Sequence, residues 1–177
     1  MILQKEFYFI RHGQTDGNLN LSVKTSHGDI SLNQTGVAQA KEIEPLIALL
    51  PIKSVCFSPL VRAKQTKEIC CSNLKSIAHH ELPNLTECNP EIWQKMTALG
   101  AEAITCSQEP VCTFMQRVRT GINEALSMEG PVLIVAHGGI HWAMCCFMQV
   151  EHNWIVDNCV PIHFSCVSNR WIARKLT

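Results

Sequence analysis

The sequence lacks an excess of charge of either sign. Lysine and arginine together account for 15 of its 177 residues, and aspartate and glutamate also account for 15. No basic stripe with interleaved aromatic residues occurs, although such a stripe is the usual footprint of a nucleic-acid or anionic-membrane surface. We therefore expect neither nucleic acid nor a membrane as partner. A small molecule or a local site on another protein fits this composition better.

Long apolar runs are also missing. No segment reaches the roughly 20 consecutive apolar residues that span a bilayer. At the amino terminus no basic stretch is followed by a long apolar run, the pattern of a secretory leader. We accordingly expect a cytoplasmic protein.

The sequence has no Cys-x-x-Cys pair, the spacing typical of zinc sites and dithiol redox centres, although it contains 10 cysteines. Cys56, Cys145 and Cys146 lie in apolar runs, and two pairs of cysteines are sequence neighbours, which make poor structural bridges. We predict reduced thiols that act mostly as small buried hydrophobic residues.

No linker, repeat or low-complexity stretch divides the chain, and its length suffices to bury roughly 70% of the surface of the unfolded chain. A single domain over residues 1–177 is therefore expected. Three short apolar runs, at 7–10, 54–57 and 132–136, have the composition of strands buried on both faces. Residues 162–167 and 171–173 are expected to form two closing strands.

Apolar residues at spacings of three and four predict helices between these strands: from Val37 to Ile47, after Pro59, from Val111 to Leu126, and from Ile140 to Val150. Pro45 either kinks the first of these helices or ends it early. The alternation of strands and helices predicts an α/β fold, a three-layer α/β/α sandwich with a mostly parallel central sheet.

Each of the three buried runs leads into a polar cluster. The clusters are Arg11-His12-Gly13, the segment from Ser58 to Arg62, and His137-Gly138-Gly139. Ligands of such folds bind beyond the carboxyl ends of the strands. The three clusters are therefore expected to form one site.

The clusters contain the groups that phosphoryl transfer requires, namely a nucleophile and cations around the non-bridging oxygens. A neutral imidazole at His12 can attack phosphorus without help from a metal. Arg11 and Arg62 match phosphate oxygens in bidentate fashion. Ser58 and Pro59 are predicted to begin the helix that carries Arg62 in its opening turn.

The third cluster complements these groups. His137 supplies a positive or hydrogen-bonding contact to the phosphate if it is protonated or donates a hydrogen bond. Gly13, Gly138 and Gly139 allow the backbone to approach a ligand closely.

The three clusters and several shorter stretches follow one another along most of the chain. They are residues 9–15 with Asn18; Asp29 and Leu32 followed by residues 36–40; residues 58–63 with Gln65 and Thr66; residues 85–87; Phe114 with Arg117 and Val118; and residues 135–139. This ordered set resembles the histidine phosphatase superfamily in its phosphoglycerate-mutase-like branch.

The resemblance implies that His12 becomes phosphorylated, that Arg11, Arg62 and His137 hold the phosphate, and that Glu87 is the proton donor. Water then hydrolyses the phosphohistidine, and neither a metal nor another cofactor is expected. The resemblance also implies that Asn18 lies near the phosphate. Gly13, Thr15 and Gly138 are the further candidates for phosphate or substrate binding.

The sequence departs from the family after Glu87, where glycines and a tryptophan-glutamate pair are usual and Cys88-Asn89-Pro90-Glu91-Ile92-Trp93 stands instead. Glu91 is therefore an alternative acid. The expected function is hydrolysis of a small phosphorylated metabolite, with a phosphorylated protein residue as a second substrate class. A phosphoglycerate-mutase activity and a non-catalytic domain that binds phosphorylated ligands remain the alternatives.

One rival motif is present, because Cys56 and Arg62 have the Cys-x5-Arg spacing of cysteine-dependent phosphatases. The intervening residues contain no glycine, and Pro59 has no amide proton, so the loop would make a poor phosphate cradle. We expect Cys56 to point into the core from a strand.

Overall fold

The computed structural model describes residues 1–19, 29–150 and 156–176. Its sheet has six strands in the order β3-β2-β4-β1-β5-β6. The strands are β1 (Phe7–Arg11), β2 (Ser54–Phe57), β3 (Ala78–Glu81), β4 (Val132–Ala136), β5 (Ile162–Val167) and β6 (Arg170–Lys175). β1 to β4 are parallel, whereas β5 is antiparallel to β1 and β6 to β5. The predicted mostly parallel sheet is confirmed.

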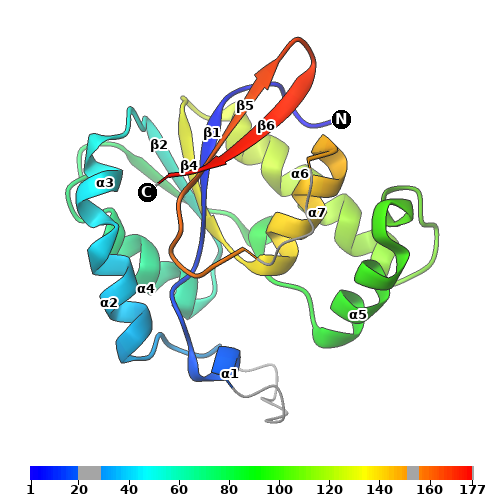
Figure 1. Cartoon of the computed structure of the whole chain (residues 1–177), viewed down its shortest axis with the longest axis horizontal. Coiled ribbons are helices and arrows are strands. Elements are labelled where there is room, and N and C mark those ends of the chain that lie inside the picture. Colours follow the sequence, from blue (N-terminus) through cyan, green and yellow to red (C-terminus); the bar gives the residue numbers. More distant parts are fainter. Residues whose placement is uncertain (20–28, 151–155, 177) are drawn as a thin grey trace.

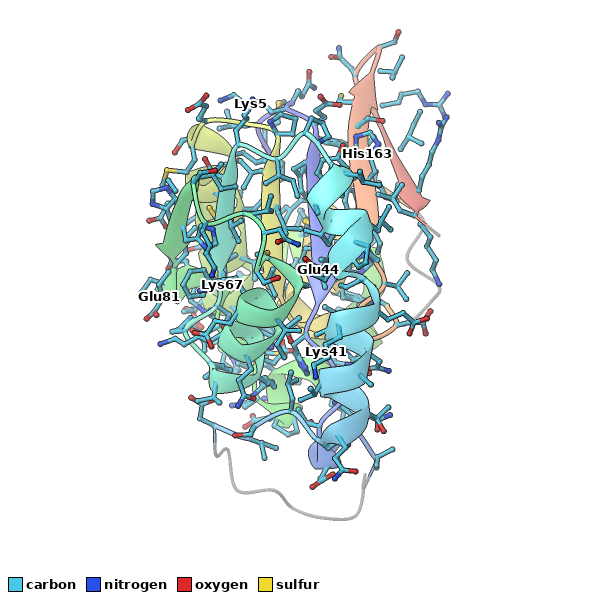
Figure 2. The ribbon with its side chains drawn as sticks, turned by 90° about the vertical axis from the view of Figure 1, so that its left-hand side faces the viewer. Lys5, Lys41, Glu44, Lys67, Glu81 and His163 are labelled. Atoms are coloured by element: carbon cyan, nitrogen blue, oxygen red, sulfur yellow. The ribbon has the colours of Figure 1, made fainter. Side chains whose placement is uncertain are left out.

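Helices cover both faces of this sheet (Figure 1). One layer contains α2 (Gln34–Glu42), α3 (Glu44–Leu49) and α4 (Val61–Cys70), and Figure 2 views the molecule from this side. The other contains α5 (Pro90–Leu99), α6 (Val111–Ser127) and α7 (Gly138–Met148). Shorter segments are α1 (Asp16–Leu19) and the 3-10 helices η1 (Pro83–Leu85) and η2 (Gly100–Ile104). The three-layer α/β/α arrangement is as predicted. No helix within the described ranges is long and apolar enough to cross a membrane.

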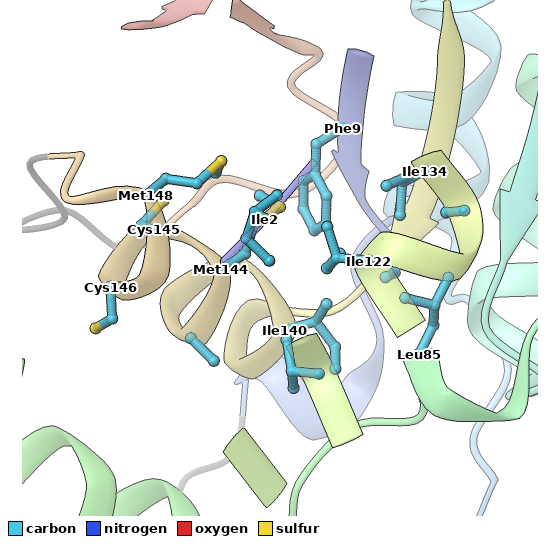
Figure 3. Close-up of a cluster of buried hydrophobic side chains, with 14 of the residues drawn as sticks. Ile2, Phe9, Leu85, Ile122, Ile134, Ile140, Met144, Cys145, Cys146 and Met148 are labelled. Atoms are coloured by element: carbon cyan, nitrogen blue, oxygen red, sulfur yellow. The ribbon is translucent and has the colours of Figure 1, made fainter. Parts of the chain in front are cut away.

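The central strands are buried on both sides because successive side chains point to opposite faces. In β1, Phe7 and Phe9 belong to the core beneath α6 and α7, whereas Tyr8 and Ile10 belong to the core on the opposite face. Figure 3 shows the first core, where Phe9 lies beside apolar side chains of α6 and α7. The continuous apolar runs of the sequence are thus explained by two cores that share one sheet.

Pro45 ends one helix and stands at the start of the next. α2 stops at Glu42, and α3 begins at Glu44 with the proline in its first turn, where no amide hydrogen is needed. Of the two predicted outcomes, early termination is therefore the one observed. β3 was not predicted from the sequence, because Ala78-His79-His80-Glu81 is a half-exposed edge strand without an apolar run.

Candidate active site

The polar clusters that follow β1, β2 and β4 lie together at one edge of the sheet. β4 pairs with β1 on one side and with β2 on the other, so the three carboxyl ends are adjacent. The His12 amide donates to the Ala136 carbonyl at 3.0 Å, and the Ser58 amide donates to the Val135 carbonyl at 3.1 Å. The predicted convergence of the three clusters is therefore observed.

A cavity of about 540 Å³ opens at this edge. Its walls come from the segment after β1, the start of α4 and the turn that leads into α5. The lining residues are Arg11, His12, Thr15, Gly17, Asn18, Ile30, Leu60, Arg62, Thr86, Glu87, Cys88, Asn89, Pro90 and Trp93.

The hydrogen bonds of His12 fix which ring nitrogen carries the proton. Nδ1 lies 2.8 Å from the carbonyl oxygen of Gly13, which can only accept, so Nδ1 is the donor. Nε2 lies 3.2 Å from Nε of Arg62, which can only donate, so Nε2 keeps its lone pair. Burial and the neighbouring Arg62 guanidinium lower the pKa of His12 from 6.5 to about 3. His12 is therefore a neutral imidazole at the cavity wall with a lone pair on Nε2.

The two arginines reach the same cavity from different elements. Arg11 ends β1 and donates from Nη1 to the Val156 carbonyl at 2.8 Å. Arg62 lies in the first turn of α4, as predicted. Burial lowers the pKa of both guanidinium groups, and the nearby Glu87 opposes this shift. Both remain charged, because an arginine keeps its proton in proteins.

His137 is fully buried next to His12 and is not among the residues that line the cavity. The two ring centroids are 5.1 Å apart. Burial, followed by His12 and the nearby arginines, lowers the pKa of His137 well below its usual value, which leaves this ring neutral. Within the described residues, two buried side-chain nitrogens have no hydrogen-bond partner, Nδ1 of His137 and Nε of Arg11. Both belong to this site.

The predicted cap of α4 is wrong. The helix begins at Val61, whose amide donates to Oδ1 of Asp29 at 2.6 Å, and Ser58 lies outside it. The Ser58 hydroxyl is 2.7 Å from Nε2 of His137 and accepts a long hydrogen bond from the Leu60 amide. Ser58 therefore orients His137. The first amide of the helix is instead hydrogen-bonded by the carboxylate of Asp29, which lies more than thirty residues earlier in the chain than Val61.

Glu87 and Glu91 occupy different environments. Glu87 lines the cavity, and its carboxylate accepts hydrogen bonds from the amides of Cys88 at 2.9 Å and Gly139 at 3.1 Å. Glu91 is exposed on α5, outside the cavity lining, and pairs with Lys95 at 2.8 Å. The geometry thus brings Glu87, and not Glu91, to the other predicted residues.

Close backbone approach at the glycines serves packing within the protein. A Cβ atom at Gly139 would collide with the Glu87 carboxylate, and one at Gly13 would overlap the Gly36 carbonyl. At Gly138 a Cβ atom would make only an ordinary contact, 3.8 Å from Nε of Arg11. None of the three predicted glycines is part of the cavity lining, so their contact with a ligand stays a prediction.

Thr15 and Asn18 line the cavity next to His12. Oδ1 of Asn18 accepts hydrogen bonds from the Thr15 amide at 3.0 Å and from the Thr15 hydroxyl at 3.2 Å. These bonds hold the side-chain amide of Asn18 in place through its oxygen, and the amide nitrogen takes part in neither of them.

Several residues of the site were not predicted from the sequence. Asn158 donates from Nδ2 to the His12 carbonyl at 2.6 Å, and the Cys159 amide donates to the Arg11 carbonyl at 2.9 Å. The apolar lining residues Ile30, Leu60 and Trp93 were also not predicted. No sequence motif identifies these residues. Asn158 and Cys159 bond to backbone carbonyls, and the three apolar residues have no distinctive chemistry.

Cys88 lines the cavity, and burial together with the neighbouring Glu87 holds the pKa of its thiol well above the usual range, so this thiol stays protonated. Cys56 points into the core from β2, as expected, and burial raises the pKa of its thiol to about 12. All ten cysteines are free thiols, and six are buried. Across the part of the chain that the structure describes, no three His, Cys, Asp or Glu side chains gather as a metal ion would require.

Comparison with protein-family models identifies a family for this chain. The chain matches the model of the histidine phosphatase superfamily (branch 1) over residues 7–176. It is 44% identical over 184 aligned residues to an agropine synthesis reductase of Rhizobium rhizogenes, and the match covers 94% of this chain but 41% of the relative. The chain thus spans less than half the length of the curated reductases that it matches.

Two phosphatases are matched over most of their own length. An adenosylcobalamin/alpha-ribazole phosphatase of Salmonella typhimurium is 27% identical over 151 residues, which are 75% of this chain and 74% of the relative. The crystal structure of a putative alpha-ribazole-5'-P phosphatase from Escherichia coli K-12 has the same fold. It superposes with a TM-score of 0.73 at 20% identity, covering 97% of this chain and 96% of that chain.

Proposed function

The chain belongs to the histidine phosphatase superfamily (branch 1), and from that premise we propose that it hydrolyses small phosphomonoesters through a phosphohistidine on His12. The observation that carries this proposal is the state of His12. Its ring is neutral and lines the cavity, its Nε2 keeps the lone pair, and Arg62 is hydrogen-bonded to that same atom. A nucleophile and a phosphate-binding cation are thus already in contact.

In the first chemical step, Nε2 of His12 attacks phosphorus and the bond from phosphorus to the leaving oxygen breaks. The electron pair of that bond goes to the leaving oxygen, which takes a proton from Glu87, so this step starts from the protonated form of that side chain. Arg62 exchanges its bond with Nε2 for a phosphate oxygen. Nε of Arg11 and Nδ1 of His137, the two unpartnered nitrogens, are the other groups proposed to stabilise the charge on the phosphoryl oxygens.

In the second step, water attacks phosphorus and the bond from phosphorus to Nε2 breaks. The electron pair returns to the imidazole, and the Glu87 carboxylate accepts a proton from the water. Inorganic phosphate leaves, and the starting protonation states of His12 and Glu87 are restored. Neither step requires a metal or another cofactor.

The lining of the cavity supports an uncharged substrate body. It includes three large apolar side chains, Ile30, Leu60 and Trp93. Among the described lining residues the cationic side chains are Arg11 and Arg62, and the proposed mechanism engages both with the phosphate. Neither is then left over for a second anionic group. We propose that phosphate esters with a neutral, partly apolar body are better substrates than esters that carry a carboxylate.

This preference weighs against the phosphoglycerate-mutase alternative, whose substrate carries a carboxylate. Isomerisation of 3-phosphoglycerate faster than release of phosphate would establish the mutase instead. The non-catalytic alternative is disfavoured because the proposed nucleophile, the two arginines and Glu87 lie around one cavity.

The proposal is tested by steady-state hydrolysis of an activated aryl phosphate in the presence of a chelator. The wild-type protein and the His12→Ala variant are compared, and a panel of neutral and carboxylated phosphomonoesters follows. Turnover that disappears in the variant supports the phosphohistidine enzyme. A folded wild-type protein that binds phosphate without turnover would favour the binding domain.

A further inference from the structure

We propose that Arg117 of α6 is a positioning residue that holds the turn carrying Glu87. The inference rests on the proposed function, because it concerns the proton donor of the same reaction. Arg117 does not line the cavity, and its side-chain hydrogen bonds go to carbonyls of the protein, so we assign it no contact with the substrate.

The guanidinium group of Arg117 joins two carbonyls of this turn. Its Nη1 donates to the Asn84 carbonyl at 3.0 Å and to the Thr86 carbonyl at 2.7 Å. η1 ends at Leu85, and the carbonyls at the end of so short a helical turn lack partners within the helix. The Thr86 carbonyl belongs to the peptide unit that leads directly into Glu87. Arg117 thus fixes the backbone one bond away from the residue that carries the carboxyl group.

Packing holds Arg117 itself in place. Its guanidinium carbon lies 5.0 Å from the centre of the Phe114 ring, one turn earlier in α6. On the next turn, a Cβ atom at Gly121 would lie 2.7 Å from Cβ of Asn84, so the helix and the turn are in close contact. Nδ2 of Asn84 also donates to Glu124 at 3.1 Å. Among these contacts of α6, the one from Arg117 reaches nearest to Glu87.

The charge of Arg117 lies close to the same segment. Burial lowers the pKa of its guanidinium group, and the neighbouring Cys88 and Glu87 raise it. A lysine would keep the charge, but it could not place a planar group on the Phe114 ring and reach both carbonyls in the same way. Arg117→Lys should therefore preserve only part of the positioning.

The consequence is a dependence on the leaving group. An alkoxide is a poor leaving group and needs the proton of Glu87, whereas a dinitrophenolate leaves without one. If the turn shifts when Arg117 is lost, the carboxyl group no longer meets the leaving oxygen. Displacements of about 1 Å are enough to lower rates substantially. Esters with alkyl leaving groups should suffer, and dinitrophenyl phosphate should not.

The test compares kcat/KM of the wild-type protein and the Arg117→Ala variant on an alkyl phosphate and on dinitrophenyl phosphate. kcat/KM reports the steps up to departure of the leaving group and is unaffected by the later hydrolysis of the phosphohistidine. Arg119→Ala is the matched control, because Arg119 is an exposed arginine on the same helix.

We expect Arg117→Ala to lower kcat/KM about 10-fold or more on the alkyl ester and by less than about 2-fold on the dinitrophenyl ester. Arg117→Lys should show a smaller loss with the same selectivity. Arg119→Ala should leave both values within about 2-fold of wild type. Equal losses on the two esters, or no loss on either, would overturn the proposal for Arg117.

The outcomes separate this inference from the proposed function. Should Arg117→Ala fail to fold, as judged by thermal unfolding, the Arg117→Lys variant decides by its selectivity between the two esters. If turnover of the wild-type protein depends on His12 but the Arg117 variant loses equal activity on both esters, only the positioning role of Arg117 is refuted. A wild-type protein inactive on both esters refutes the proposed function and this inference with it.

Discussion

Replacing His12 with glutamine should make the folded protein less sensitive to acid. The pKa of His12 falls from 6.5 to about 3 on folding, because burial and Arg62 disfavour the imidazolium form. The unfolded chain therefore binds a proton at a pH where the folded chain does not. The stability that depends on a neutral His12 is fully present above pH 6.5, and it is lost as the pH falls toward 3.

The magnitude follows from these two pKa values. At pH 5 an unfolded imidazole of pKa 6.5 is about 97% protonated, which stabilises the unfolded state by about 2 kcal/mol relative to its neutral form. At pH 7 the same contribution is only about 0.2 kcal/mol. Lowering the pH from 7 to 5 should thus cost the wild-type protein about 2 kcal/mol through His12 alone.

The assay is urea unfolding of the wild-type protein and the His12→Gln variant at both pH values. The variant should lose about 2 kcal/mol less than the wild-type protein between pH 7 and pH 5, whatever its stability at pH 7. His137→Gln should change the loss in the same direction, because burial also lowers the pKa of His137. Identical losses in the wild-type protein and the His12→Gln variant would refute a neutral, buried His12.

The remaining predictions concern turnover. Glu87→Gln should lower kcat/KM for alkyl phosphates by roughly 100-fold to 10,000-fold, whereas Glu91→Gln, on the exposed face of α5, should change it little; the reverse result in the same assay would assign the acid to Glu91. Gly139→Ala places a methyl group against the Glu87 carboxylate and the Cys88 thiol, and the folded variant should show the same selective loss on alkyl esters; full activity would contradict the packing argument. Cys56→Ser should keep its turnover while losing about 1–3 kcal/mol of stability, because a hydroxyl group is then buried in the core; a collapse of turnover in a folded variant would revive the cysteine mechanism. Vanadate should inhibit, and EDTA should leave the hydrolysis rate unchanged; loss of activity in EDTA would disprove a metal-free reaction.

The sequence predicted the central sheet and the meeting point of its polar clusters for a physical reason. Residues 7–10, 54–57 and 132–136 are continuous apolar runs because cores lie on both faces of the strands that they form. Once those strands are parallel neighbours, the residues after them must share one edge of the sheet. The proximity of His12, Arg62 and His137 therefore follows from the hydrophobic pattern together with the adjacency of these three strands.

Other features depend on contacts that no local pattern records. The edge strand β3 has no apolar run, since half-exposed side chains suffice at the border of a sheet. The amide of Val61 at the start of α4 donates a hydrogen bond to Asp29, which is distant in sequence. The Ser58 hydroxyl is instead hydrogen-bonded to His137. Asn158 supports the His12 backbone through a carbonyl, an interaction available to any residue type at position 12.

A rapid-quench experiment with a radiolabelled phosphomonoester is the decisive test of the phosphohistidine mechanism. A covalent phosphoenzyme should form before phosphate is released. Its label should be stable in base and labile in acid, as a phosphohistidine is, and should map to the peptide that contains His12. His12→Ala should form no such species and release no phosphate above background. Label on another residue, or full turnover by His12→Ala, would contradict this mechanism.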